Sequence, residues 1–496
     1  MAGALPTVAV PTGRAAPLTA LRVLANALFI MALLLINVGG TYGSGVFFAI
    51  LTVMVFVSPE AAFKSLAICY LGLMLNFAFV PKSLVWTPGR IILPFLALLR
   101  FGLDLAAYRL SPFQRASYAS LVFFAAVMAI CSIASGWYTH IALLKILYFL
   151  TFYTVVSAAT IVLRHRRADL GEWFVSLCLA AALFGVAAIA LNIDGNFRAL
   201  KVDAYQTVSS SGFNGAFAHP NAHAVYASLF VTFLAIVWLL SRYRQRWLVL
   251  PLMACWMTFI VWSESRTAFL ATAAGVFFLV LNARPLRNRL GWKMRPNLSR
   301  RTVIGVGIAV ATLGLLWNAA TENTLGKSIA SYIVKGAINE FDYQAQVSME
   351  RIVSSRKGLI EFSWHNFLAN PLTGIGFGVA KTDAFQANAT YLTAPAEKGF
   401  LPTAILEEGG MLGTAAFVLY ICVFSWELLR ERNTAGIVML WTMLITNLGE
   451  MTIFSPGGAG AFSWIMVGAA MLFGDRCWTP PPVHATASSH SHTWRP

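Results

Sequence analysis

Residues 141–163 decide the fold: they read IALLKILYFLTFYTVVSAATIVL and are followed at once by the basic run Arg164-His165-Arg166-Arg167. An apolar run of this length can cross the hydrocarbon core of a membrane as a helix. Short loops rich in Lys and Arg stay in the cytoplasm, so the basic run also gives the segment a direction. Together they predict a membrane helix that ends at the cytoplasmic face.

The same alternation of apolar runs and short basic loops continues along the 496-residue chain. Hydrophobic residues make up 58% of the sequence, charged residues make up 11%, and the mean hydropathy is +0.69. A soluble chain carries about 25% charged residues, so much of this surface has to face lipid. The 36 basic against 20 acidic residues have the same origin, because many of the basic ones lie in the short loops. We therefore favour a topological role for them over nucleic-acid binding.

We expect an all-α polytopic membrane protein with about 12–14 transmembrane helices, cytoplasmic termini and a large, partly helical periplasmic loop before the last three spans. This divides the chain into N-terminal helices (1–172), a transmembrane core with a first periplasmic motif loop (173–320), the large loop (321–402), C-terminal helices (403–475) and a disordered cytoplasmic tail (476–496). The expected spans lie near 19–38, 42–57, 62–80, 88–103, 117–134, 141–163, 173–192, 222–240, 247–262, 267–283, 302–320, 403–424, 434–453 and 457–473.

The large loop carries seven basic and seven acidic residues, a balance consistent with an exported segment. Apolar residues at helical spacing over 344–367 predict one or two helices against the outer face of the bundle, ended by Asn370-Pro371. The glycines at 374, 376 and 378 are not a dinucleotide-binding fingerprint, because no strand precedes them. The six cysteines have neither metal nor redox spacing, so we expect small buried hydrophobes and no metal site.

Two polar motifs fall where expected outer loops enter spans. His219-Pro220-Asn221 places a proline suited to the first turn of a helix whose N-terminus can receive an anionic group. Ser263–Arg266 places an arginine that can hold a phosphate with two hydrogen bonds. Each motif also has an interpretation without a site. The first can be a glycine-rich helix entry, and in the second Arg266 can reach the lipid headgroups or pair with Glu264.

Two more motifs lie in and after the large loop. The helical stretch with Arg351, Arg356 and Lys357 also holds His365, a candidate proton-transfer group, and a solvated amphipathic helix is the alternative interpretation. Glu407-Glu408-Gly409-Gly410 places two carboxylates at the mouth of a span. They can supply a base, while the glycines allow close helix approach. Alternatively, the acids only mark the membrane boundary.

Taken in this order, the motifs resemble those of the bacterial O-antigen ligase and O-antigen polymerase superfamily, which includes exopolysaccharide polymerases. The segments that carry the resemblance are 215–222, 265–271, 351–378 and 406–413, within about residues 173–473. The resemblance implies a metal-independent glycosyltransferase of the bacterial inner membrane, without a cofactor. Its donor is a polyprenyl-diphosphate-linked glycan at the periplasmic face. Membrane lipid, a flippase and a chain-length regulator are the further partners implied.

In this scheme the catalytic candidates are Arg266, Arg351 and Arg356, which bind the diphosphate and stabilise the leaving group, and Glu408 and His365. Glu408 orients an arginine or acts as the base, and Glu407 and His365 are the alternative bases. The candidates for substrate binding are His219, Asn221, Arg198, Lys357 and Glu407.

Ligases of this superfamily carry His-Asn shortly before the last motif, whereas 397–400 reads EKGF here. This departure favours polymerisation of repeat units, and transfer of glycan to lipid A-core or protein is the alternative. A lipid or solute transporter is a third hypothesis. We disfavour it because the polar motifs gather at one face and the sequence shows no internal repeat.

Overall fold

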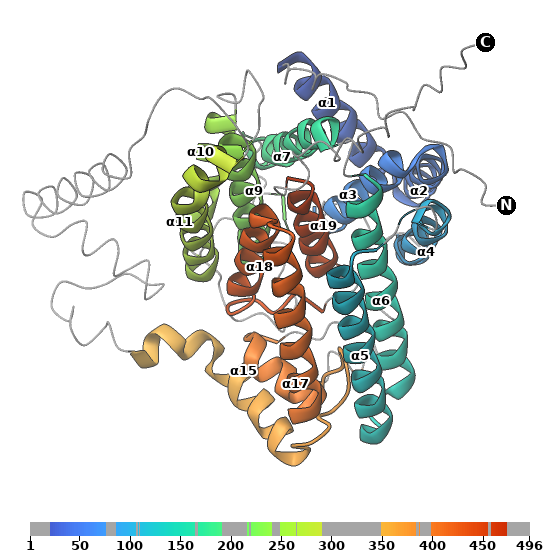
Figure 1. Cartoon of the computed structure of the whole chain (residues 1–496), viewed down its shortest axis with the longest axis vertical. Coiled ribbons are helices and arrows are strands. Elements are labelled where there is room, and N and C mark those ends of the chain that lie inside the picture. The colour runs from blue at the N-terminus through green and yellow to red at the C-terminus, as the bar shows by residue number, and fades with distance from the viewer. Residues whose placement is uncertain are drawn as a thin grey trace, which may run out of the picture.

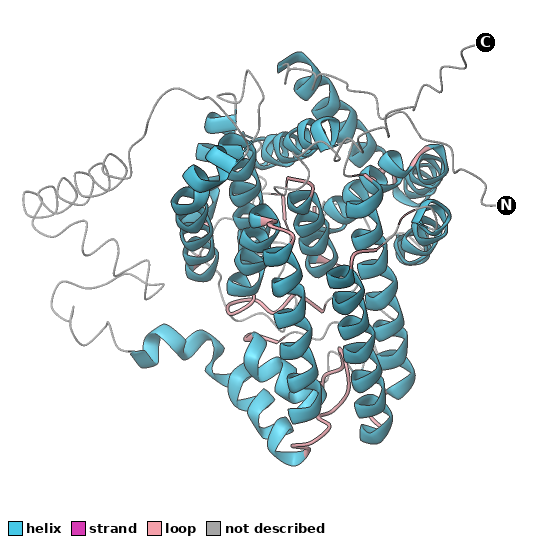
Figure 2. Cartoon of the chain, in the orientation of Figure 1, coloured by secondary structure: helices cyan, strands magenta, loops and turns pink. Residues whose placement is uncertain are grey.

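The computed structural model describes residues 20–75, 86–105, 108, 110–163, 167–190, 216–217, 220–240, 249–263, 265–289, 349–382, 386, 398–454 and 458–473. Within its helices, the side chains at 74, 86–87, 167–168, 220–222, 283–289 and 349–357 are not described. This part of the chain is helical, apart from loops and an isolated bridge between Leu75 and Phe217 (Figure 2). The helices are α1 (Ala20–Ile36), α2 (Gly40–Val57), α3 (Pro59–Met74), α4 (Trp86–Leu105), α5 (Pro112–Ser135), α6 (Thr139–Val162), α7 (Arg167–Ala190), α9 (Pro220–Leu240), α10 (Val249–Trp262), α11 (Arg266–Arg289), α15 (Met349–Ala369), α17 (Leu401–Arg430), α18 (Thr434–Thr446) and α19 (Ala459–Met471).

Among the described residues, six helices are long and apolar enough to cross a membrane: α2, α5, α6, α7, α9 and α17. Shorter apolar helices include α1, α10, α18 and α19. Every expected span coincides with a helix except 302–320, which lies outside the described residues. The described part of the chain is thus all-helical, with several helices of the kind found in multi-pass membrane proteins.

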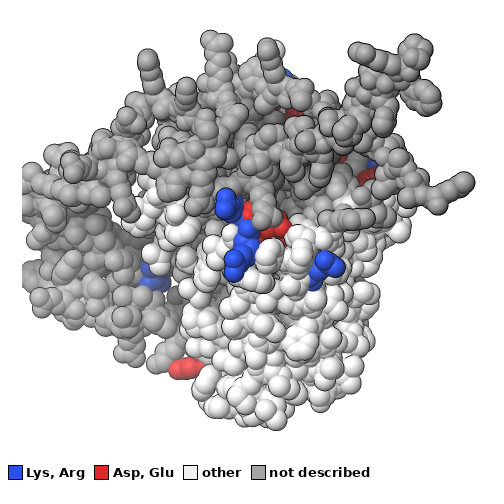
Figure 3. Space-filling model, viewed as in Figure 1, with Lys and Arg blue, Asp and Glu red and all other residues white. Residues whose placement is uncertain are grey.

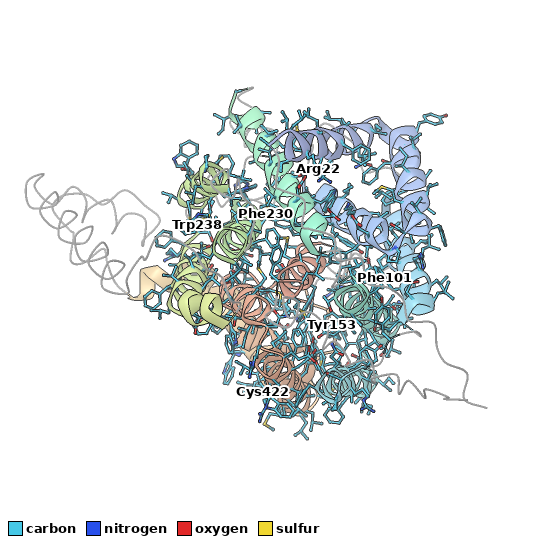
Figure 4. The ribbon with its side chains drawn as sticks, turned by 45° about the horizontal axis from the view of Figure 1, so that its top comes forward. Arg22, Phe101, Tyr153, Phe230, Trp238 and Cys422 are labelled. Carbon is cyan, nitrogen blue, oxygen red and sulfur yellow. The ribbon has the colours of Figure 1, made fainter. Side chains whose placement is uncertain are left out.

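Helix α9 lies at the centre of the bundle, because 94% of its most apolar window is buried inside the protein. Helices α10, α11, α18 and α19 pack on α9, and α19 also reaches α6. On the other side, α5 packs between α6 and α17, and these three run side by side in Figure 1. Seen from the upper end, Phe230 of α9 and Tyr153 of α6 lie in the interior (Figure 4).

Aromatic rings join the two sides of the bundle. Tyr153 meets Trp464 of α19 edge-on at 5.1 Å between ring centroids, and Tyr420 of α17 at 5.5 Å. Phe124 of α5 stacks on Tyr420 with an interplanar angle of 10°. Such pairs add directional stabilisation beyond the apolar area that they bury.

Cys422 corrects the expectation that the cysteines are buried. Cys69, Cys131 and Cys178 are buried, but Cys422 is exposed, and Figure 4 shows it at the outer edge of α17. A helix surface that faces lipid gives a thiol an apolar environment without burying it in the protein. An apolar run in the sequence therefore cannot distinguish a cysteine buried in the protein from one exposed to lipid. No cluster of potential metal-ligating residues occurs within the described residues.

Candidate functional site

The site begins with α15, which lies across the end of the bundle where α17 starts (Figure 1). It ends at Ala369, immediately before Asn370-Pro371, as predicted. Ser363 and Asn366 are three residues apart and therefore share a face of the helix. The Ser363 hydroxyl donates to Oε2 of Glu407 at 2.7 Å, and the Asn366 amide donates to Oε1 at 2.8 Å. Glu407 thus fastens α15 to α17.

Glu407 and Glu408 are both 1% exposed and lie on either side of the Lys398 ammonium. Lys398 Nζ is 3.2 Å from Oε2 of Glu407 and 3.2 Å from Oε1 of Glu408. The other oxygen of Glu408 accepts the N–H of Gly378 at 2.8 Å. All four carboxylate oxygens therefore have a partner, as buried charge requires. We call Lys398, Glu407 and Glu408 the buried ion triad.

Lys398 stays protonated in this buried position. Burial lowers the pKa of a lysine, but the carboxylates of Glu408 and Glu407 outweigh burial here and leave the pKa of Lys398 above its usual value. Lys398 is therefore a cation at neutral pH and holds the two carboxylates together.

A break in α17 follows directly after the triad. Gly410 has non-helical dihedral angles (φ 60°, ψ −158°), so the carbonyls of Glu407 and Glu408 lose their usual helical partners, the N–H groups of residues 411 and 412. The segment 371–376 fills the break. Ile375 and Gly376 donate to the two carbonyls at 2.7 and 2.9 Å, while the N–H groups of residues 411 and 412 donate to the carbonyls of residues 371 and 372 at 2.9 and 3.2 Å. The third and fourth motifs are thus two halves of one backbone structure.

Glycine is required where these halves touch. A Cβ on Gly374 would lie 2.4 Å from the carbonyl oxygen of Glu407, and one on Gly410 would lie 2.4 Å from the carbonyl carbon of Leu372. Both residues also have a positive φ, which glycine adopts without strain. Gly409 and Gly413 face Met128 of α5 at close range, so the predicted close helix approach at these glycines is confirmed.

The glycine segment is also anchored to the bundle. Phe377 inserts among aromatic residues, with its ring centroid 5.2 Å from that of Phe454 and 5.9 Å from that of Phe149. Its N–H donates to Ser132 of α5 at 3.1 Å, and Lys145, buried on α6, donates to the carbonyl of Gly378. Two buried cations and two buried carboxylates therefore surround this segment.

The second motif reaches the same end of the bundle through the segment 447–453. Leu401 N–H donates to the carbonyl of Asn447 at 3.2 Å, and Met451 N–H donates to the carbonyl of Lys398 at 3.3 Å. Gly449 of this segment lies directly against the side chain of Thr267. Arg266, the preceding residue and the first of α11, is half-buried there.

The first motif lies at this end too. Helix α9 begins at Pro220, as predicted, and its Ser228 hydroxyl is 3.3 Å from that of Thr446, one residue before Asn447. The ring of His223 meets Phe217 edge-on at 4.8 Å and lies 5.4 Å from the ring of Phe259 of α10, four residues before Ser263 of the second motif. Segments from four distant parts of the chain thus converge.

The predicted site residues fare differently. Arg266, Glu407 and Glu408 are brought to this end of the bundle, whereas His365 is exposed on α15 and makes no described contact with the triad. Asn221, Arg351, Arg356 and Lys357 lie on helices whose side chains there are not described, and Arg198 and His219 lie outside the described residues. Burial in the triad corrects the alternative that Glu407 and Glu408 merely mark the membrane boundary.

Sequence reasoning missed Lys398, Ser363 and Asn366 as parts of the site. Lys398 is one of seven basic residues in the large loop, so its own type carried no signal. The signal lay in the acids: two adjacent carboxylates inside an apolar helix need a cation and hydrogen-bond donors. The i, i+3 pair in a helix on the same side was the other available clue.

No protein-family model matches this chain, and no curated protein is significantly similar to it.

Proposed function

We propose that this protein is a glycosyltransferase of the bacterial inner membrane. It would polymerise polyprenyl-diphosphate-linked oligosaccharide repeat units into exopolysaccharide or O-antigen at the periplasmic face. The observation that carries the proposal is the convergence of four separate motifs at one end of a bundle of membrane-length helices. Arg266 begins α11 there, and the triad fastens α15, the helix of Arg351 and Arg356, to the same end.

The proposed chemistry is displacement at the reducing-end sugar of the donor. The acceptor hydroxyl oxygen forms a bond to the anomeric carbon, and the bond from that carbon to the diphosphate oxygen breaks. Polyprenyl diphosphate leaves with the electron pair, and the hydroxyl proton passes to a base. Arg266, Arg351 and Arg356 would bind the diphosphate and stabilise its growing negative charge. The N-terminus of α9, with His219 and Asn221, would bind the anion from another side.

The triad supports a positioning role for Glu407 and Glu408. A general base has to reach the hydroxyl whose proton it takes, and the oxygens of both residues are occupied by protein groups. His365, exposed on the same helix as Arg351 and Arg356, is the candidate base with free access. Arg198 and Lys357 stay proposed contacts to the substrate.

Helix α17 supports a proposal for the two sides of the membrane. Arg430 and Arg432 lie at its far end, more than twenty residues after Glu408. Figure 3 shows no charged side chain over the lower parts of α5, α6 and α17, below a small charged group near the upper end of α17. Basic residues at helix ends favour the cytoplasm, which would place the triad end in the periplasm and the termini in the cytoplasm.

Lys398 also bears on the choice between polymerase and ligase. It lies in the stretch where the resemblance places a histidine in ligases, and it is buried with its charge directed at Glu407 and Glu408. A buried lysine so engaged cannot take the proton-transfer role of a histidine. We therefore propose polymerisation over ligation.

The proposal predicts that Arg266→Ala and Arg351→Ala abolish polymer in cells while the protein still inserts into the membrane. Loss of a charge that stabilises a leaving group costs about 10²–10³-fold in rate. Arg115→Ala, which removes a cation near the far end of α5, is the matched control and is expected to keep polymer at the wild-type level. Normal polymer in both site variants would contradict the assignment of the arginines.

A further inference from the structure

Helices α11 and α18 meet through two reciprocal contacts between a glycine and a threonine. A Cβ on Gly449, just after α18, would lie 2.0 Å from Oγ1 and 2.5 Å from Cβ of Thr267 on α11. In the opposite sense, a Cβ on Gly275 of α11 would lie 2.4 Å from Oγ1 of Thr442 on α18. Each helix thus presents a threonine to a glycine of the other. We call these four residues the glycine–threonine contacts.

Two such contacts fix how α11 lies along α18. Thr267 and Gly275 are eight residues apart on α11, and Thr442 and Gly449 are seven apart on the other side, so the contacts are two helical turns apart. Small residues let membrane helices approach closely, and a close contact at two heights allows neither sliding nor tilting.

The contact between Gly449 and Thr267 lies next to charged groups of the site. Thr267 follows Arg266, while Gly449 lies between Asn447 and Met451, which bond to the backbone of Leu401 and Lys398. The Asn447 side chain holds this segment in shape, because Oδ1 accepts the N–H groups of Thr452 at 2.6 Å and Ile453 at 2.9 Å. The path from Arg266 to Lys398 is therefore short and closely packed.

We propose that the glycine–threonine contacts, with Gly449 as the decisive member, are a positioning device that sets Arg266 against the triad. This inference rests on the proposed function only in that Arg266 is taken to bind the diphosphate. Gly449 touches no substrate. It acts by leaving room for Thr267, and through Thr267 it fixes where the first turn of α11 lies.

The test is a compensating pair of substitutions. Gly449→Ala introduces the Cβ, and adding Thr267→Gly removes the atoms that it would meet. Gly102→Ala on α4 is the matched control, because a Cβ there meets nothing within 4 Å. Spin labels at the exposed positions Leu270 and Leu412 report the distance between α11 and α17, in a Cys255→Ser/Cys422→Ser/Cys477→Ser background. Binding of inorganic diphosphate to the purified protein in lipid nanodiscs is the second measurement.

We expect Gly449→Ala to shift the spin-label distance and weaken diphosphate binding about tenfold, because moving Arg266 by about 1 Å takes a charged hydrogen bond to the diphosphate beyond its normal length. The double variant should restore both, and Gly102→Ala should change neither. If Gly449→Ala does not fold, restoration of folding by Thr267→Gly tests the same contact. An unshifted distance, or a defect that Thr267→Gly leaves uncorrected, would overturn the proposal, as would a shifted α11 with unchanged affinity. Absence of diphosphate binding in the wild type would instead count against the proposed function, and the distance measurement would still decide the contact.

Discussion

Lys398 is the residue on which the two carboxylates of α17 depend. It contacts both at 3.2 Å and is itself only 3% exposed, so the two carboxylates are neutralised by this lysine and not by bulk solvent. Two adjacent carboxylates without a cation in a buried site would repel each other and lose their solvation at the same time. The positions of α15 and of the glycine segment, both bonded to these carboxylates, therefore depend on one ammonium group.

Lys398→Met is expected to destabilise the protein by about 3–5 kcal/mol, because removing one partner leaves uncompensated buried charge. Thermal unfolding in detergent, compared with Lys381→Met, measures the effect. Lys381 is partly exposed and lies over the ring of Trp137 at 5.6 Å, so its loss removes a lysine without stranding a carboxylate. Equal melting temperatures for the two variants would show that the triad does not stabilise the fold.

The same lysine gives the stability a dependence on pH. Its pKa in the folded protein is raised above the value of about 10.4 expected in the unfolded chain. Because the folded-state pKa is the higher one, the contribution of Lys398 to the free energy of unfolding is complete below the unfolded-state pKa. That contribution is lost as the pH rises through the folded-state pKa. The difference in melting temperature between wild type and Lys398→Met should hold from pH 7 to 9 and shrink at pH 11. A difference that already shrinks by pH 9 would show that the ion pairs do not raise this pKa.

At the scale of elements, the break in α17 is the feature that organises the site. The segment 371–376 supplies the hydrogen bonds that Gly410 removes from the helix, and its glycines lie in backbone contact with residues 407–410. Broken helices in membrane proteins are tolerated only where other protein groups satisfy the freed backbone. The break therefore places the triad, the glycine segment and α15 in one arrangement.

Gly374→Ala is expected to cost more stability than Gly136→Ala. Both residues have a φ near +65°, so both substitutions carry the left-handed strain of about 1–2 kcal/mol. A Cβ at Gly136 meets nothing within 4 Å, whereas one at Gly374 meets the backbone of residues 407 and 408. The difference between the two melting temperatures isolates the contact with α17. Equal losses would mean that the segment does not seat in the break as described.

The sequence predicted most elements because lipid leaves few choices: an apolar run of membrane length has to satisfy its own backbone and becomes a helix. The expected spans 117–134 and 141–163 coincide with α5 and α6. The break at Gly410 could not be predicted in the same way. A glycine in an apolar run is also compatible with a straight helix, and the partner segment lies more than thirty residues earlier in the chain.

At the scale of the whole molecule, the bundle has two unlike ends. One end holds the converging motifs, with the triad buried in it, and the other holds Arg430 and Arg432 of α17. The sequence predicted that the motifs share a side of the membrane, because spans and basic loops alternate. The sequence could not predict which motif residues contact each other, because contacts such as that between Gly449 and Thr267 depend on how helices from distant parts of the chain pack.

Cysteine labelling tests this polarity. In a Cys255→Ser/Cys422→Ser/Cys477→Ser background, Glu361→Cys on the exposed face of α15 should react with a membrane-impermeant maleimide applied to cells with a permeabilised outer membrane. Arg432→Cys, just past the end of α17, should react only after the inner membrane is opened. Reaction of both positions from the same side would show that the two ends do not face opposite compartments.

Reconstitution of the purified protein in liposomes with a polyprenyl-diphosphate-linked repeat unit tests the proposed glycan transfer. Product size and released polyprenyl diphosphate are then measured for wild type, Arg266→Ala and Arg115→Ala. Wild type and Arg115→Ala should give a ladder of longer glycans with matching release of polyprenyl diphosphate, and Arg266→Ala should give neither. Transfer that occurs only when a lipid A-core or protein acceptor is added would identify a ligase instead. An intact donor in the presence of folded wild-type protein would contradict the claim of glycan transfer.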